Sequence, residues 1–387
     1  MKNTARRVLK KNAAAARLRR SAAPVAGHQT RQEIFSQPET WVETARRFEQ
    51  DGTIARTLQN FTKEGPWLFV ACGSSYYLSR TIVAQWAQLF QRRCTAVPAS
   101  ELLFAPQEVM RRTEARQVVL VSRSGKTTEV LRAAEWMKAN AAVQTLGVTC
   151  NEDSVLEETC THMLKLPWAD EKSMVMTRSF TSILLHFERL GAKFMGDAEL
   201  ARALEALPEK TERWLAANAD KIRALGTKRR FADFVFLGQR AHYWLAQEAA
   251  LKMTEMSSSY AQAYHTLEFR HGPKSIASKD TLITFLLSDD AAEEESQLIG
   301  EVKKLGAATF VVTNRATPAL RRDNDLLIEL GLDEPEYARL ALTAIPAQLL
   351  GLAVGLRKKL DPDVPKNLTR AVVLGSNKAV PVKRRSA

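Results

Sequence analysis

Three hydroxyl side chains follow a short apolar run in the first half of the chain. Ser122, Ser124 and Thr127 come directly after Val118–Val121. A strand that ends in small hydroxyl residues and leads into a helix leaves free backbone N–H groups, with the positive end of the helix dipole behind them. Gly125 lets this backbone approach a ligand closely because glycine has no Cβ. The spacing favours a phosphate-binding turn, with an ordinary strand-to-helix turn as the alternative.

The sequence Gly125–Thr127 does not belong to a nucleotide-binding P-loop. The motif GxxxxGK[ST] requires a glycine where this chain has Leu120. ATP and GTP are therefore excluded as ligands of this turn.

A second group of titratable side chains lies in the other half of the chain. Glu248, Lys252 and Glu255 are spaced at i, i+4 and i+7, so they share one face of a predicted helix. Carboxylates at a strand-to-helix edge of an open α/β sheet can transfer protons on a bound ligand. A solvated, salt-bridged helix face is the alternative. Downstream, His265 and His271 lie in or near a predicted loop.

Thr177 and Arg178 precede a further predicted helix. A guanidinium can bind phosphate bidentately, so these residues could complete the anion site. The alternative is a helix N-cap at Thr177 or Ser179.

The elements that must position these residues alternate between strand and helix. Trp67–Ala71 is a predicted buried strand that leads into Gly73, Ser74 and Ser75, and Thr145–Cys150 is another. Strands that alternate with helices predict a parallel sheet with right-handed crossovers.

The second half of the chain repeats the first with weak sequence similarity. Three pairs of matching positions differ by 165, 166 and 163 residues: Gly73 and Gly238, Ser122 and Ser288, and Asn151 and Asn314. Concordant offsets predict two copies of one α/β unit. The second copy has Asp289 and Asp290 where the first has Arg123 and Ser124, and these acids would repel phosphate. Only the first copy is therefore expected to bind the anion.

Length and composition indicate a soluble two-domain protein. The chain has 387 residues, 45% of them hydrophobic, and no apolar run was found that approaches the roughly 18 residues needed to cross a bilayer. The net charge of the chain is +13, and nine basic residues but no acidic ones precede Glu33. The residues from Glu33 onward therefore carry a net charge of about +4. This distribution suits a phosphorylated ligand and gives little support to nucleic-acid or membrane binding.

Four cysteines without CxxC or zinc-site spacing indicate a reducing cytoplasm and no metal site. The predicted organisation is a disordered basic tail over residues 1–32, a first domain over 33–207, a helical connector over 208–230, a second domain over 231–375 and a basic tail over 376–387.

Together these segments resemble the sugar isomerase (SIS) superfamily, specifically the double-SIS proteins related to the isomerase half of glutamine:fructose-6-phosphate amidotransferase. The resemblance covers roughly Glu33 to Val373. The segments on which the resemblance rests are Gly73–Tyr76, Ser122–Thr127, Glu248–Tyr264, Glu268–Ser275 and Asn367–Val372. Within that group the chain looks most like the bacterial tagatose-6-phosphate ketose/aldose isomerases, also described as galactosamine-6-phosphate deaminases. The resemblance implies two tandem doubly wound, flavodoxin-like α/β domains.

The resemblance also implies roles for single residues. The residues expected to hold the 6-phosphate of an amino sugar are Ser75, Ser122, Arg123, Ser124 and Thr127. It implies that Glu255 moves a proton between C1 and C2, that Glu248 and Lys252 orient the open sugar, and that His271 assists ring opening from the neighbouring subunit of a homodimer. Neither step needs a metal or an organic cofactor.

Two departures from the amidotransferase pattern favour degradation over synthesis. We expect no glutaminase domain, because the chain begins with a basic tail and has no N-terminal Cys nucleophile. Arg370 stands where the amidotransferase has a Schiff-base lysine, and arginine cannot take that role, although it can hold a hydroxyl or oxyanion. The expected reaction is deamination with isomerisation of galactosamine or glucosamine 6-phosphate. The alternatives are aldose–ketose isomerisation, deglycation of a fructosamine 6-phosphate, and a non-enzymatic sugar-phosphate sensor.

Overall fold

The computed structural model describes residues 25–374 except 51, 91–92 and 323. Most of the predicted N-terminal tail, and all of the tail predicted over 376–387, lie outside the described residues. All four cysteines lie within them and are free thiols.

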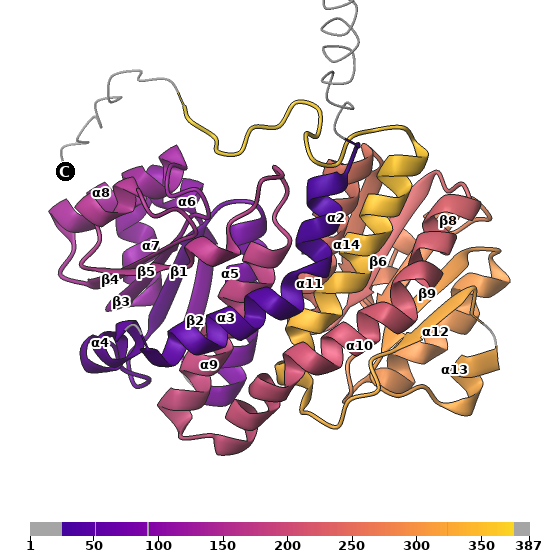
Figure 1. The fold of residues 1–387 in the computed structure, drawn as a ribbon, viewed down its shortest axis with the longest axis horizontal. Helices are drawn as coiled ribbons and strands as arrows, with labels where there is room; N and C mark the ends of the chain where they lie inside the picture. The colour runs from indigo at the N-terminus through magenta and orange to yellow at the C-terminus, as the bar shows by residue number, and fades with distance from the viewer. Residues whose placement is uncertain (1–24, 51, 91–92, 323, 375–387) are drawn as a thin grey trace, which may run out of the picture.

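The first half of the chain forms one parallel five-stranded sheet in the order β2-β1-β3-β4-β5. Its strands are β1 (Trp67–Ala71), β2 (Cys94–Pro98), β3 (Gln117–Val121), β4 (Gln144–Thr149) and β5 (His162–Lys165). The helices between and after these strands are α5 (Ser74–Phe90), α6 (Ala99–Phe104), α7 (Pro106–Thr113), α8 (Thr128–Asn140) and α9 (Arg178–Met195), with short 3-10 turns η1 (Val155–Glu158) and η2 (Pro167–Ala169). Helices cover both faces of the sheet (Figure 1).

The second half repeats this topology, in the order β10-β9-β8-β6-β7. Its strands are β6 (Asp233–Gly238), β7 (Tyr260–His265), β8 (Thr281–Leu286), β9 (Ala308–Thr313) and β10 (Leu326–Glu329). The accompanying helices and turns are α11 (Ala241–Ser257), η3 (Glu268–Arg270), η4 (Pro273–Ile276), α12 (Ala292–Lys304), α13 (Pro318–Arg322), η5 (Glu336–Arg339) and α14 (Leu340–Arg357). In each sheet the first strand lies between the second and the third, so the predicted tandem doubly wound α/β architecture is confirmed.

The first folded domain begins earlier than the sequence predicted. Its first helices are α2 (His28–Phe35), α3 (Gln37–Gln50) and α4 (Thr53–Asn60). Residues 28–32, expected to belong to a tail, form the start of α2. Thr30 is fully buried there, and its amide and hydroxyl each donate to Asp363 Oδ1 over 2.7 Å. This contact with the far end of the chain explains the difference.

The predicted connector over 208–230 is part of one longer helix, α10 (Ala198–Lys228). Asp197 caps it by accepting the amide of Leu200 over 2.9 Å, and Pro208 lies inside the helix.

The expectation that no stretch is long enough to cross a membrane is wrong for Glu336–Arg357. This segment passes by length and composition, with a mean hydropathy of 1.5, yet 94% of its apolar window is buried inside the protein. It contains α14, which packs against α10 and α11. The apolar side chains of this segment therefore form part of the protein core.

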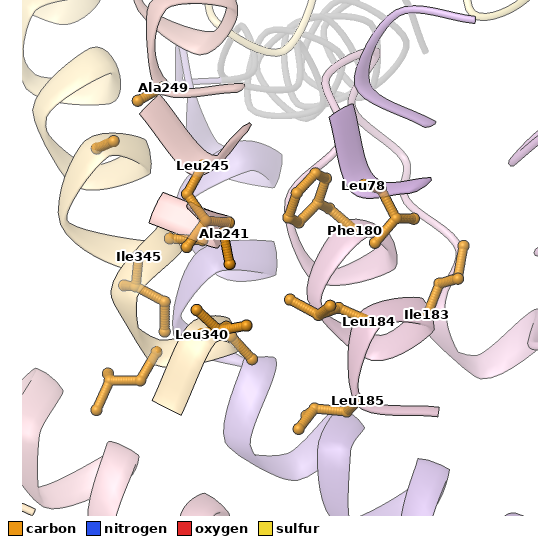
Figure 2. Close-up of a cluster of buried hydrophobic side chains, with 14 of the residues drawn as sticks. Leu78, Phe180, Ile183, Leu184, Leu185, Ala241, Leu245, Ala249, Leu340 and Ile345 are labelled. Carbon is orange, nitrogen blue, oxygen red and sulfur yellow. The ribbon is translucent and has the colours of Figure 1, made fainter. Parts of the chain in front are cut away.

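A single buried cluster joins the two halves of the protein. Figure 2 shows Leu78 of α5 and Phe180 of α9 beside Leu245 of α11, with Leu340 and Ile345 of α14 next to them. The helices between the two sheets therefore form a shared core, and their relative positions are fixed by close packing.

A glycine in this core gives a stability test. Gly355 of α14 would place an added Cβ 2.2 Å from the carbonyl oxygen of Met256 at the end of α11. Gly355→Ala should therefore lower the free energy of unfolding by about 1–3 kcal/mol, because two packed helices must separate. Urea denaturation followed by circular dichroism measures this change.

Gly300→Ala is the matched control, since an added Cβ on this residue of α12 would have no neighbour within 4 Å. It should raise stability by about 0.5–1 kcal/mol through helix propensity. Equal effects of the two substitutions would show that the packing of α14 on α11 is looser than described.

Candidate active site

The switch point of the first sheet lies at the carboxyl ends of β1 and β3. These strands are neighbours, with Ala71 paired to Val121, and their partners β2 and β4 lie on opposite sides. Open α/β sheets hold ligands at such a switch point, because the connections leave the sheet in opposite directions there. Ser75, in the first turn of α5, and the turn after β3 both lie at this edge.

The structure brings together the three hydroxyl groups of the turn. Ser122 Oγ lies 3.0 Å from Thr127 Oγ1 and 3.5 Å from Ser124 Oγ, and Ser124 Oγ accepts the amide of Lys126 over 3.2 Å. They precede α8, whose N-terminus supplies a partial positive charge. Ser75 Oγ lies 3.6 Å from Met176 Sδ in the neighbouring segment.

Gly125 is required by the shape of this turn. Its φ is +66°, and an added Cβ would lie 2.1 Å from Ser154 Oγ and 3.1 Å from Thr149 Oγ1. A larger residue would therefore displace the turn from the end of β4.

Arg123 directs its guanidinium into the protein. Nη1 pairs with Glu171 Oε2 at 3.0 Å, and Nη2 donates to the carbonyls of Met174 at 2.9 Å and Arg370 at 3.3 Å. Glu171 also accepts the amides of Thr177 at 2.6 Å and Ser179 at 2.9 Å. The side chain of Arg123 thus joins three segments beside the turn.

Glu171 was missed by the sequence reasoning. The only available signal was an acid a few residues before the predicted N-cap at Thr177 and Ser179. Its carboxylate now caps α9, so the cap comes from Glu171 and not from a hydroxyl of Thr177.

The candidates Thr177, Arg178 and Arg370 lie in different surroundings. Thr177 is fully buried against Glu171. Arg370 pairs with Asp170 and offers its carbonyl to Arg123, so it borders the same cluster. The guanidinium of Arg178 instead donates to the carbonyl of Asp170 and, over 3.3 Å, to Ser36 Oγ, and it is not among the groups that contact the hydroxyl turn in the described chain.

A C-terminal segment crosses the start of α8 (Figure 1). The amide of Thr128 donates to the carbonyl of Val372 over 3.1 Å, and Thr128 Oγ1 accepts the amide of Leu374 over 3.0 Å. The helix that follows the hydroxyl turn is therefore bordered by the C-terminal segment of the described chain.

The predicted face of α11 is buried. Lys252 Nζ lies 3.4 Å from Glu248 Oε1 and pairs closely with Glu255 Oε2, and the Lys252 side chain is 1% exposed. The two carboxylates raise the pKa of Lys252 against the opposing effect of burial, so the ammonium form is favoured. The alternative interpretation, a solvated and salt-bridged helix face, is therefore excluded.

Glu248 has an unusual environment for a carboxylate. Burial raises its pKa to about 7, and the charge of Lys252 offsets only part of this rise. Ser74 of α5 also favours the ionised form, yet neither Glu248 oxygen has a hydrogen bond of good geometry within the described chain. A carboxyl group that changes charge near neutral pH in a crevice is a candidate for proton transfer or substrate binding.

The two clusters are neighbours because α5 and α11 pack antiparallel. Tyr76 lies against Trp244, with ring centroids 6.5 Å apart, and Arg80 stacks over the same ring. Burial raises the pKa of Tyr77, and the charge of Glu248 adds to this rise. The charge of Arg123 slightly lowers the pKa of Lys252. The carboxylates of the second copy therefore lie against α5, the helix that begins at the carboxyl end of β1.

His271 lies apart from this group. It is exposed in the turn between η3 and η4, and its amide donates to the carbonyl of Glu268 over 3.0 Å. No group of three or more His, Cys, Asp or Glu placed to hold a metal ion occurs within residues 25–374 as described.

The raised pKa of Glu248 predicts a pH-dependent stability. Because the folded value of about 7 exceeds the ordinary 4.5, the folded protein binds this proton more tightly than the unfolded chain. Its stabilising contribution is complete below about pH 4.5 and is lost as the pH rises towards 7, at up to ~1.4 kcal/mol per pH unit. Glu248→Gln should therefore show a flatter decline of unfolding free energy across this range than the wild type.

Urea titrations at several pH values measure this slope, and Glu294→Gln on the exposed side of α12 is the control that should leave it unchanged. Identical slopes for wild type and Glu248→Gln would contradict the assigned pKa.

Comparison with known proteins identifies the fold of both halves. A model of the SIS domain matches residues 60–192 and 233–354. Glutamine–fructose-6-phosphate aminotransferase (isomerizing) of Methanothermobacter thermautotrophicus is 29% identical over 308 residues, which cover 79% of this chain and 51% of that protein. The chain spans little more than half the length of the curated relatives it matches.

Solved structures agree with the family match. Glucosamine-6-phosphate deaminase from Thermotoga maritima is 31% identical with a TM-score of 0.72, over 89% of this chain and 100% of that chain. Tagatose-6-phosphate ketose/aldose isomerase from Escherichia coli shares the fold, with a TM-score of 0.79 at 19% identity over 91% of this chain and 98% of that one. The resemblance noted in the sequence is confirmed: the chain contains two SIS domains and belongs to the SIS domain family, alongside proteins named as sugar-phosphate isomerases and deaminases.

Proposed function

We propose that the protein is an amino-sugar-6-phosphate deaminase/isomerase that converts galactosamine or glucosamine 6-phosphate to the ketose 6-phosphate and ammonia. The observation that carries this proposal is the packing of α5 on α11, which places the buried cluster of Lys252, Glu248 and Glu255 against the helix that begins at Ser74 and Ser75. One half of the protein offers hydrogen-bond donors for a phosphate, and the other offers groups that can move a proton nearby.

The proposed reaction uses these groups in sequence. Ser75, Ser122, Ser124 and Thr127 hold the 6-phosphate, and the amides before α8 add to them. Glu255 removes the proton from C2 of the open sugar and returns it to C1. A second proton passes from the amine nitrogen to the C1 oxygen, so the amine-bearing carbon becomes an imine and C1 becomes an alcohol. Water then adds to the imine carbon, and ammonia leaves.

The buried cluster supports this assignment of roles. Lys252 is held as an ammonium between two carboxylates, so it can stabilise negative charge that develops on the sugar oxygen at C1. Glu248 orients the sugar through its hydroxyl or amino groups. Arg123 acts as a positioning residue, because its guanidinium is bonded to Glu171 and two carbonyls.

Ring opening is assigned to His271 of a second copy of the chain. Its exposed position between η3 and η4 leaves it available to a neighbouring subunit. A cytoplasmic homodimer with a shared site is therefore part of the proposal. The alternative reaction is aldose–ketose isomerisation by the same residues, and ammonia release distinguishes the two.

Glu255→Gln tests the proton transfer. The substitution removes the base and retains a similar shape, so kcat for ammonia release should fall by about 10²–10⁴-fold while sugar-phosphate binding changes little. Ammonia release from galactosamine 6-phosphate and glucosamine 6-phosphate, assayed side by side, measures kcat. Glu293→Gln, at an exposed position of α12, is the control for loss of one surface charge.

Near wild-type turnover by Glu255→Gln would remove Glu255 from the mechanism. A wild-type protein that releases ammonia from neither sugar, but interconverts aldose and ketose phosphates, would replace deamination by plain isomerisation.

Ser122→Ala and Ser124→Ala test the phosphate site. Loss of one hydrogen bond to a charged oxygen costs about 1.5–3 kcal/mol, so each variant should raise KM by roughly 10- to 100-fold with a small effect on kcat. Ser288→Ala, at the corresponding position of the second copy, is the matched control. An unchanged KM for the first two variants would mean that the phosphate binds elsewhere.

A further inference from the structure

A buried carboxylate, Glu171, lies between the hydroxyl turn and the start of α9. Its side chain is 0% exposed, and within the described chain Arg123 is the cation paired with it. Oε1 accepts the amides of Thr177 over 2.6 Å and of Ser179 over 2.9 Å. Oε2 accepts the hydroxyl of Ser179 over 2.6 Å and Nη1 of Arg123 over 3.0 Å. One carboxylate therefore joins the helix start to the turn.

Arg123 lies inside the hydroxyl turn, between its two serines. The carbonyl of Arg123 accepts the amide of Cys150 over 2.9 Å and the hydroxyl of Thr149 over 3.1 Å, which ties the main chain of the turn to the end of β4. The side chain of Arg123 makes the connection on the other side, to Glu171 and to the carbonyl of Met174. The turn is thus held between β4 and the segment that precedes α9.

The segment that precedes α9 is itself fixed at both ends. Glu33 of α2 accepts the amide of Lys172 over 2.6 Å, and Glu171 caps the helix at the other end. Between these two points, Met176 Sδ lies 3.6 Å from the hydroxyl of Ser75, which belongs to the proposed phosphate site. Glu171 therefore connects the turn to a segment that is already held in place.

The pair of Arg123 and Glu171 is buried, with side-chain exposures of 5% and 0%. Removal of one partner from a buried pair leaves the other charge without compensation away from water. Without the carboxylate, the Arg123 guanidinium must move towards solvent, and the turn that carries it must move too. Hydrogen bonds weaken as their geometry departs from the ideal, so a displaced turn holds a phosphate less tightly.

We propose that Glu171 is a positioning residue for phosphate binding. It acts through Arg123 and holds the serine hydroxyls of the turn in place without contacting the ligand. Because the 6-phosphate is remote from C1 and C2, the loss of Glu171 falls on ligand Kd and on KM and leaves kcat little changed. This inference rests on the proposed phosphate site at the hydroxyl turn.

Calorimetric titration with glucitol 6-phosphate measures this role without turnover, since this open-chain sugar phosphate has no carbonyl to isomerise. Glu171→Gln keeps an acceptor for the α9 amides but presents no negative charge to Arg123, so Kd should rise about tenfold, or ~1.4 kcal/mol. Arg123→Gln breaks the same link from the side of the turn and should have a similar effect. The double variant should also lose only about tenfold, because both substitutions remove one interaction, whereas independent roles would give about a hundredfold loss.

Ser179→Ala is the matched control, because it removes a hydrogen bond to Glu171 at the cap of α9 and leaves the Arg123 contact intact. It should lower the free energy of unfolding and leave Kd unchanged. The proposal is overturned if Glu171→Gln binds as tightly as the wild type, if the two effects multiply in the double variant, or if Ser179→Ala weakens binding as much as Glu171→Gln. If Glu171→Gln does not fold, Arg123→Gln decides: a tenfold rise in Kd supports the role, and an unchanged Kd overturns it.

The wild type separates this inference from the proposed reaction. If it binds glucitol 6-phosphate but releases no ammonia from either hexosamine phosphate, the deamination is removed and the positioning role stands. If it does not bind glucitol 6-phosphate, the phosphate site is removed and this inference falls with it. For the substrate that the wild type does convert, Glu171→Gln should raise KM by about the same factor as Kd.

Discussion

The antiparallel packing of α5 against α11 is the constraint on which the candidate active site depends. Each helix begins at the edge of its own sheet and ends over the corresponding edge of the other copy. Ser74, at the start of α5, thereby lies beside Glu248, and Ala241, at the start of α11, lines a cavity with Ala84. Because an α-helix turns by about 100° per residue, a shift of one residue in either helix would move the carboxylate face away from the start of α5. The shared core around Leu78 and Leu245 prevents that shift.

Buried charge pairs set the local geometry within this frame. Lys252 is held by two carboxylates, and Arg123 is held by Glu171, with side-chain exposures of at most 5% for Lys252, Arg123 and Glu171. Loss of one partner from such a pair leaves an uncompensated charge away from water, which costs more than the pair itself contributes. These groups are therefore confined to a narrow range of positions. Arg123 also bonds the carbonyls of Met174 and Arg370, so the place of the turn depends on segments far apart in the sequence.

Local patterns accounted for the strands, the internal repeat, the hydroxyl turn and the shared face of α11, because each follows from spacing within a short segment. Contacts between distant segments could not be predicted in this way. The partner of the Arg123 guanidinium is one example, and the start of α2 at His28, fixed by Asp363, is another. The apolar character of α14 also depends on context, since a helix of that composition could lie in a core or in a bilayer.

The difference between the turns that follow β3 and β8 can be traced to one pair of corresponding acids. Glu295, on α12, bonds the amide and hydroxyl of Ser288 and so fills the anion seat of the second copy from within. Its counterpart at the 166-residue offset is Glu129, in the first turn of α8. Glu129 does not take that position: one of its oxygens is buried without a partner in the described chain, and Ser122 pairs with Thr127 instead. The duplicated fold thus supplies the same donors twice, and the placement of a single carboxylate decides whether they are left for a ligand.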